Sequence, residues 1–139
     1  MAYKFLPHTG DVKVLASGKT IEEAFSFSAA ALRETISGKL KIKTIVEKTI
    51  HISGKNYEAL LYNFLEEIIY LLDAEDFAFS KLGEFKIHSN KEKFLLDATL
   101  LGDKASGYKF GNEVKAITYN EMFVKRGKDE AIVQFVLDV

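Results

Sequence analysis

Two aspartates are the residues best suited to chemistry, because each stands at the end of a segment with the alternation of a β-strand. In "DVKVLAS", residues 11–17, Asp11 lies opposite the apolar face, and in "AIVQFVLDV", residues 131–139, Asp138 does the same. If these segments are antiparallel neighbours, the start of one lies beside the end of the other and the two carboxylates meet. A parallel arrangement would separate the carboxylates by about seven residues at ~3.3 Å each, too far to share an ion.

A carboxylate pair of this kind has two chemical outcomes. At a separation of ~4 Å the two charges repel by roughly 4 kcal/mol at an effective dielectric of about 20, so the pair either shares a proton or binds a cation. Hard divalent cations prefer oxygen ligands, and calcium also accepts backbone carbonyls, so the main-chain oxygen of Val139 can complete the set. An alternative stays open at this point, since both aspartates can be ordinary surface residues at strand ends.

Three further side chains are candidates for a binding site. His8 lies three residues before Asp11 in a turn fixed by Pro7, where a histidine that merely caps the turn is the alternative. Glu113 and Lys115 alternate onto one face at a predicted strand entrance, directly after the polar, glycine-containing loop of residues 103–112. Their alternative interpretation is a surface ion pair of little energetic worth.

Most enzyme classes lack their defining residues here. The sequence contains no Walker A loop, no GxGxxG, no GxSxG and no cysteine nucleophile, and no serine is paired with a base. His51 and His88 fall in predicted strands and are interpreted as surface residues, too scattered to give metal-ligand spacing.

The composition predicts a single domain over residues 1–139, with 47% hydrophobic residues to build one core. The net charge of −1 argues against direct binding of nucleic acid, and the basic cluster "GKLKIK", residues 38–43, is expected to be a loop with solvent-facing lysines before an edge strand. The absence of cysteine and of an apolar leader fits a cytoplasmic protein. No membrane span is expected, because Glu66 and Glu67 interrupt the longest apolar stretch.

The elements that must position these residues follow from periodicity. A strand over 11–17 precedes a helix that begins with a capping box, Thr20 and Glu23, and runs to residues 37–38. A strand over 42–52 precedes a second helix capped by Asn56. Period-two strands follow in "FAFS", "EFKIHS", "KFLLDATLL", "EVKAITYNEMFVKR" and "AIVQFVLDV". The sequence therefore predicts an α+β fold, a mainly antiparallel β-sheet with two helices packed on one face.

Five segments in this order resemble the archease family over nearly the whole chain: "HTGDV", "GKTIEEAFSFSAAAL", "YEALLYNFLEEIIYLLD", "EVKAITY" and "VLDV". The resemblance implies a protein that is not itself an enzyme. Family members activate the tRNA-splicing RNA ligase, which joins 2′,3′-cyclic-phosphate or 3′-phosphate ends to 5′-hydroxyl ends, by promoting its guanylylation and turnover. The implied partners are that ligase, GTP through the ligase, and RNA only indirectly.

The resemblance also implies a bound metal, commonly calcium, at acidic residues near both ends of the chain. It carries the metal role to Asp11, Asp138 and the main-chain oxygen of Val139. His8, Glu113 and Lys115 lie in matching motifs and are expected to face the ligase or its nucleotide.

Three positions depart from the family pattern. Gly10 replaces the usual alanine, Phe64 replaces a common tryptophan, and Asn120 stands where histidine commonly follows "KAITY", which places any role of that position in doubt. Two other function classes stay open: a stand-alone metal-dependent phosphoesterase or nuclease with His8 as base, and a chaperone-like accessory protein in RNA modification.

Overall fold

The computed structural model describes residues 2–8 and 10–139, which form two antiparallel sheets and two α-helices. One sheet has the strand order β1-β2-β7-β6 and the other has the order β3-β5-β4. The elements in chain order are β1 (Ala2–Leu6), β2 (Asp11–Gly18), α1 (Ile21–Ser37), β3 (Val46–Gly54), α2 (Tyr57–Glu75), β4 (Phe77–Ser89), β5 (Phe94–Lys104), the 3₁₀ turn η1 (Ala105–Gly107), β6 (Ala116–Arg126) and β7 (Ala131–Asp138).

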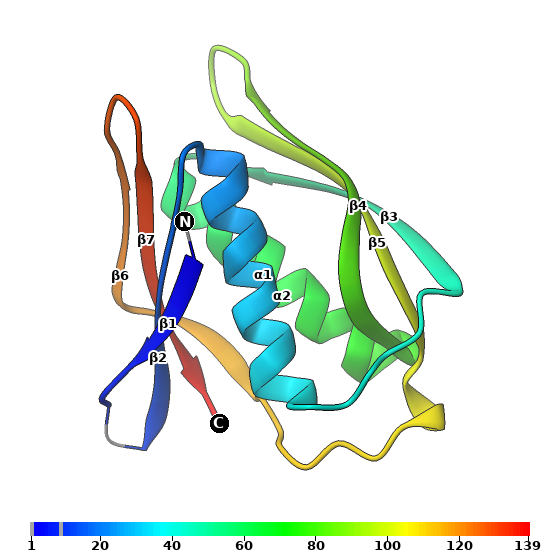
Figure 1. Ribbon diagram of the computed structural model, residues 1–139. Coiled ribbons are helices and arrows are strands. Elements are labelled where there is room, and N and C mark those ends of the chain that lie inside the picture. Colours follow the sequence, from blue (N-terminus) through cyan, green and yellow to red (C-terminus); the bar gives the residue numbers. More distant parts are fainter. Residues whose placement is uncertain (1, 9) are drawn as a thin grey trace.

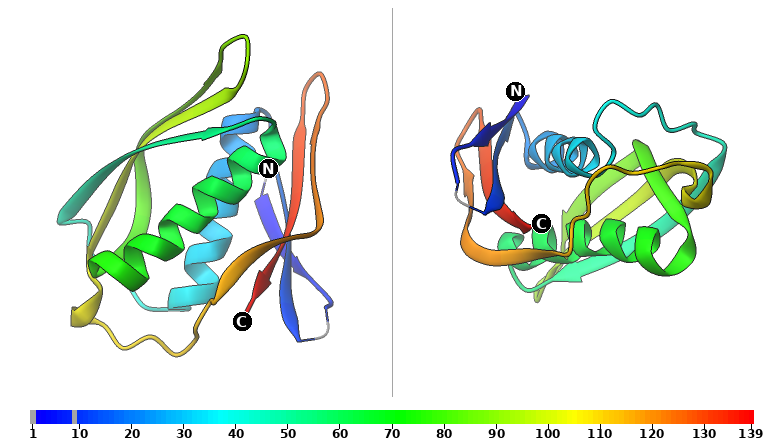
Figure 2. Two further views of the ribbon diagram at one scale, coloured as in Figure 1. Left: turned by 180° about the vertical axis from the view of Figure 1, so that it is seen from behind. Right: turned by 90° about the horizontal axis from the view of Figure 1, so that it is seen from below.

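The two helices form a layer between the sheets, as Figure 1 and the two views of Figure 2 show. α1 packs on β2 and β7 on one side and on β4 on the other, and α2 packs on β6 on one side and on β3 and β4 on the other. The predicted α+β class, the antiparallel pairing and the helix-covered sheet face are confirmed, while the strands divide into two sheets that share one helix layer.

The width of the apolar stripes explains the second sheet. Buried side chains occupy more than one narrow face of each helix, so each helix has apolar surface for a sheet on either side. In α2 the buried set is Ala59, Leu60, Leu61, Phe64, Leu65, Ile68, Ile69 and Leu71. None of the helices in the described ranges is both long and apolar enough to cross a membrane.

Both helices begin at the predicted caps. Thr20 Oγ1 accepts a hydrogen bond from the Glu23 backbone N–H at 3.1 Å, and Asn56 Oδ1 accepts one from the Ala59 N–H at 2.7 Å. The Glu23 carboxylate reaches the N–H of Lys19 at 3.4 Å, one residue before the cap itself. The Thr20 corner fixes where β2 ends and α1 begins, and the Asn56 corner does the same for β3 and α2.

Four strands differ from the prediction, and the first two are β1 and β3. β1 was not foreseen, because its five residues show no alternation and it is held at the sheet edge by pairing with β2. β3 begins at Val46 rather than at residue 42, since the Ile42 carbonyl accepts from Ser80 Oγ at 2.8 Å and the Lys43 N–H donates to Tyr108 Oη at 3.0 Å. Side chains thus take the hydrogen bonds that a strand ladder would use.

The other differences concern later strands. "FAFS" and "EFKIHS" belong to one strand, β4, with two register irregularities against β5. β6 begins at Ala116, so residues 113–115 precede it as irregular chain. The basic segment of residues 38–43 is irregular chain with exposed lysines before the edge strand β3, as predicted.

Candidate functional site

Asp11 and Asp138 lie directly opposite each other in the four-stranded sheet. β2 and β7 are antiparallel neighbours, Asp11 is the first residue of β2, and Asp138 is the last residue of β7. Figure 1 shows this end of β7 beside the start of β2. Residues paired in this way place their Cβ atoms about 4.5–5.5 Å apart on one face of the sheet. The predicted meeting of the two aspartates is therefore confirmed.

The backbone around the pair is well anchored. Gly10, at φ 78°, turns the chain into β2 in a conformation that a side chain disfavours. On the other side of β7, the Lys115 N–H donates to the Asp138 carbonyl at 2.8 Å, and Ala116 pairs with Asp138 in β6. The backbone of Asp138 is consequently fixed by the segments on both sides of β7, so its side chain is the part that can contact a ligand.

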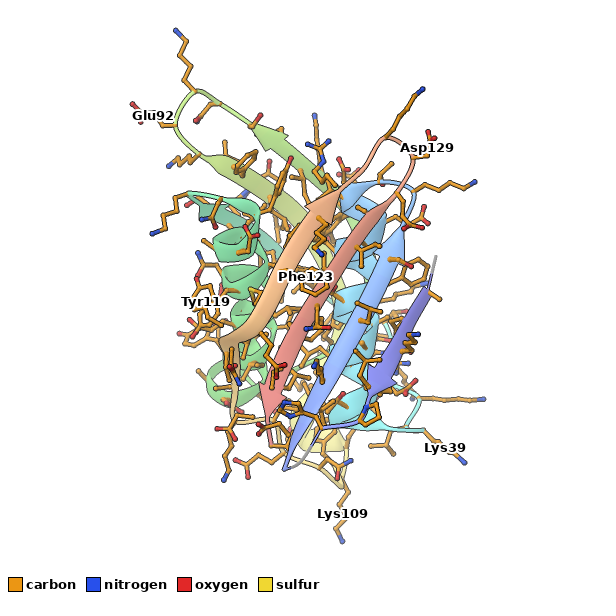
Figure 3. All side chains as sticks on the ribbon, turned by 90° about the vertical axis from the view of Figure 1, so that its left-hand side faces the viewer. Lys39, Glu92, Lys109, Tyr119, Phe123 and Asp129 are labelled. Carbon is orange, nitrogen blue, oxygen red and sulfur yellow. The ribbon has the colours of Figure 1, made fainter. Side chains whose placement is uncertain are left out.

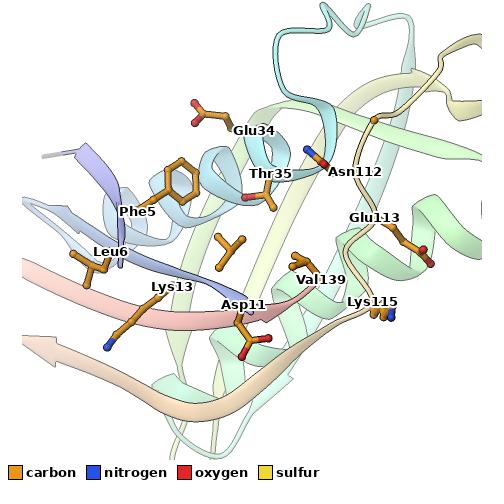
Figure 4. A pocket seen from close by; sticks show the side chains of 12 residues that line it. Phe5, Leu6, Asp11, Lys13, Glu34, Thr35, Asn112, Glu113, Lys115 and Val139 are labelled. Carbon is orange, nitrogen blue, oxygen red and sulfur yellow. The ribbon is translucent and has the colours of Figure 1, made fainter. Parts of the chain in front are cut away.

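A pocket of about 630 Å³ opens beside the aspartate pair. Figure 4 shows its lining residues, which come from β1, β2, the last turns of α1, the segment before β6, and the end of the chain after β7. They are Phe5, Leu6, Asp11, Val12, Lys13, Glu34, Thr35, Gly111, Asn112, Glu113, Lys115 and Val139. Asp138 does not line it, so the pocket reaches the carboxylate pair from the Asp11 side.

Four of the six predicted site residues therefore meet at one pocket: Asp11, Val139, Glu113 and Lys115. The prediction that Glu113 and Lys115 lie at a strand entrance is wrong in detail, because the segment is irregular and β6 starts at Ala116. Both side chains are nevertheless exposed, because Val114 between them is buried and its two neighbours point outward.

His8 does more than cap a turn. Its Nε2 lies 2.9 Å from Glu121 Oε2, and its Nδ1 lies 3.7 Å from Asp11 Oδ2. The Nδ1 atom is buried and has no hydrogen-bond partner, which is a costly state for a polar nitrogen. The imidazole is thus held beside the aspartate pair by a residue that the sequence did not indicate.

That residue, Glu121, lies in an irregularity of β6 between Thr118 and Phe123 and has φ 57°. Its carboxylate also accepts a hydrogen bond from Lys13 Nζ at 3.0 Å, and its carbonyl accepts from Gln134 Nε2 at 2.8 Å. The hydrogen bonds from Lys13 and then from His8 lower the pKa of the Glu121 carboxyl. Only the local loss of alternation in "TYNEMF" could have signalled a bulge here.

The pair suits a divalent cation of the hard class. Two carboxylates in register supply only oxygen donors, which is the chemistry that calcium and magnesium prefer. Within residues 2–8 and 10–139, no three histidine, cysteine, aspartate or glutamate side chains form a ready-made metal-binding group. The remaining ligands of such an ion must therefore be main-chain oxygens, such as that of Val139, and water.

The other two histidines are surface residues of strands, as predicted, but they are not isolated. His51 Nδ1 lies 2.6 Å from Asp97 Oδ1, and His88 Nε2 lies 2.9 Å from Asp97 Oδ2. The three residues come from β3, β4 and β5, so one carboxylate links all strands of the second sheet. These hydrogen bonds, with that of His51 the larger, lower the pKa of Asp97.

Comparison with known proteins places this architecture in a family. Residues 3–139 match the archease protein family (MTH1598/TM1083). Protein archease of Pyrococcus furiosus is 39% identical over 137 residues, covering 95% of this chain and 94% of the relative. Protein archease of Sulfolobus acidocaldarius is 32% identical over 139 residues, covering 99% and 98%.

Solved structures share the fold. The solution structure of Methanobacterium thermoautotrophicum protein 1598 is 27% identical, with a TM-score of 0.84 over 99% of both chains. The crystal structure of a Thermotoga maritima archease, described as a possible chaperone, is 23% identical, with a TM-score of 0.64 over 98% of this chain and 96% of that one. The chain belongs to the archease family.

Proposed function

We propose that this protein is a non-enzymatic, metal-binding activator of the tRNA-splicing RNA ligase and promotes guanylylation and turnover of that ligase. Membership of the archease family supports the choice of partner. The observation that carries the proposal is the register of β2 and β7, which pairs Asp11 with Asp138 at the end of the sheet. No covalent step is assigned to the activator itself.

In this proposal the two carboxylates and the main-chain oxygen of Val139 hold a divalent cation, with calcium as the expected ion. When bound, the cation supplies positive charge that can neutralise phosphate groups of a nucleotide in the partner. Asp11 is 34% exposed at its side chain and lines the pocket, so it can reach an ion that a partner also contacts.

His8, Glu113 and Lys115 are assigned to the contact with the ligase or its nucleotide. Lys115 is exposed at the pocket, and its backbone N–H bonds to the Asp138 carbonyl, so its position is tied to that of the aspartate pair. Glu113 opens from the same segment, two residues away. With a net charge of −1, the protein acts on RNA only through its partner, in the cytoplasm.

The test is a guanylylation assay with the cognate ligase, GTP and divalent metal. Asp11→Asn and Asp138→Asn keep the side-chain size and remove one charged ligand each, and both should abolish stimulation while the fold survives. Asp97→Asn is the matched control, because it removes a carboxylate from the other sheet, and it should stimulate like the wild type.

Full stimulation by Asp11→Asn and Asp138→Asn would refute the assigned metal role. A wild-type protein that does not stimulate the ligase, but cleaves phosphodiester substrates alone in a chelator-sensitive manner, would replace the proposal with the hydrolase alternative. Promiscuous binding to unrelated enzymes without ligase stimulation would favour a chaperone.

A further inference from the structure

Two potentially cationic side chains lie close enough to compete for the aspartate pair. Lys13 is two residues along β2 from Asp11 and therefore points to the same face of the sheet, where it pairs with Val136 of β7. Its side chain is only 18% exposed, so its ammonium needs a nearby anion. His8 Nδ1 is 3.7 Å from Asp11 Oδ2.

Both groups are bonded to Glu121, and His8 lies between Glu121 and Asp11. Lys13 Nζ lies 3.0 Å from Glu121 Oε1, and His8 Nε2 lies 2.9 Å from Glu121 Oε2, so each carboxylate oxygen takes one partner. In Figure 4 the Lys13 ammonium is directed away from the Asp11 carboxylate. The contact crosses β7, because β2 and β6 flank that strand on opposite sides.

Figure 3 views the outer face of the four-stranded sheet, on which β7 lies between β2 and β6. Val136 of β7 lies on that face between β2 and β6 and is only 1% exposed, so neighbouring side chains cover the outer surface of β7 at this point. Glu121 reaches over from the irregular part of β6, whose backbone at φ 57° is disfavoured for a residue with a side chain. Such a conformation persists where the surroundings determine it, as the bond from Gln134 to the Glu121 carbonyl does here.

We propose that Glu121 is a positioning residue that holds Lys13 off the Asp11–Asp138 pair and so leaves the pair open to a divalent cation. The inference rests on the metal site of the proposed function. Without Glu121, the Lys13 ammonium, whose side chain is only 18% exposed, would be left on the same face as Asp11 and Asp138, and an incoming cation would have to displace it from them. The lowered pKa of Glu121 is consistent with a carboxylate that stays ionised for this task.

The charge balance among the four residues around the pair also predicts weaker Ca²⁺ binding without Glu121. Three carboxylates and one lysine leave a net charge of −2 when His8 is neutral, counting Asp11, Asp138, Glu121 and Lys13. Glu121→Gln reduces this to −1, and the additional change Lys13→Met returns it to −2. The double variant therefore restores the charge and removes the competitor, although it lacks the Glu121 contacts altogether.

The experiment is calorimetric titration of the purified full chain with Ca²⁺ at low ionic strength, where surface charge interactions are least screened. Glu121→Gln should weaken Ca²⁺ binding about fivefold, equivalent to about 1 kcal/mol. Lys13→Met alone should bind Ca²⁺ at least as tightly as the wild type. Lys13→Met combined with Glu121→Gln should return to within about twofold of the wild type.

The rescue separates positioning from a structural role, because a damaged bulge in β6 would not be repaired by Lys13→Met. Wild-type affinity in Glu121→Gln, or a double variant as weak as the single one, would overturn this inference alone. A wild-type protein that binds no Ca²⁺ would refute the metal site and the inference together. Circular dichroism spectra of all variants serve as the control for folding.

Discussion

The opposed aspartates should make the protein less stable without calcium and more stable with it. Asp11 and Asp138 are directly paired across β2 and β7, so their charges repel in the metal-free protein. At ~4 Å this repulsion is about 4 kcal/mol at an effective dielectric of 20 and about 1 kcal/mol in water. Since Asp11 is 34% exposed, the solvent value is the better guide.

Asp138→Asn should therefore stabilise the metal-free protein by about 1 kcal/mol, which raises Tm by about 4 °C for a domain of this size. The amide keeps the size of the side chain, and the backbone bond from the Lys115 N–H to residue 138 is unaffected. Bound calcium should reverse the order of the two Tm values. At a free concentration 100 times its Kd, the ion should stabilise the wild type by about 2.7 kcal/mol, or roughly 10 °C.

The assay is differential scanning calorimetry of the wild type and Asp138→Asn, each in chelator and in calcium. The two Tm values should cross: the variant melts higher in chelator, and the wild type melts higher in calcium. Asp97→Asn controls for a general loss of surface charge and should keep the full calcium shift. A variant that melts below the wild type in chelator, or that keeps the wild-type calcium shift, would refute the reasoning.

Two further predictions concern the scaffold. The hydrogen bonds from His51 and His88 lower the pKa of Asp97, so they stabilise the folded protein fully above the unfolded pKa of about 3.9. This stabilisation is lost as the pH falls through the lower pKa of the folded state. The urea midpoint of the wild type should therefore drop more steeply below pH 4 than that of Asp97→Asn. Equal slopes would contradict this. Gly54→Ala should destabilise by about 1–3 kcal/mol in urea unfolding, because its Cβ would lie 2.5 Å from the Leu60 backbone nitrogen. Gly107→Ala is the control and should leave the stability unchanged, because its Cβ has open space around it. Unchanged stability in Gly54→Ala would contradict the prediction and show that the turn between β3 and α2 can make room for the methyl group.

Local patterns predicted much of the fold correctly. Helix caps depend on bonds within three residues, as between Thr20 and Glu23, so they can be read from the chain. The faces of β2 and β7 follow from strict alternation, which is why the meeting of Asp11 and Asp138 could be inferred from two end segments. β1 lacked such a pattern and was missed, since only its pairing with β2 makes it a strand.

The division into two sheets could not be read in the same way. Alternation states which side of a strand is buried, and it does not state which strand lies beside it. The wide buried stripes of α1 and α2 allowed either one sheet or two, and strand pairing decided for two.

The sequence by itself determined the residue types of the site, the face on which each aspartate lies, and the helices that hold the strands in place, because these depend on neighbours within a few positions. Only the tertiary structure decided that Lys13 and Glu121, 108 residues apart, share an ion pair, and that His51 and Asp97, 46 residues apart, share a hydrogen bond. The order β1-β2-β7-β6 and the irregularity in β6 bring the first pair together. Contacts between distant segments depend on strand order and register, and the physical chemistry of the single segments leaves both undetermined.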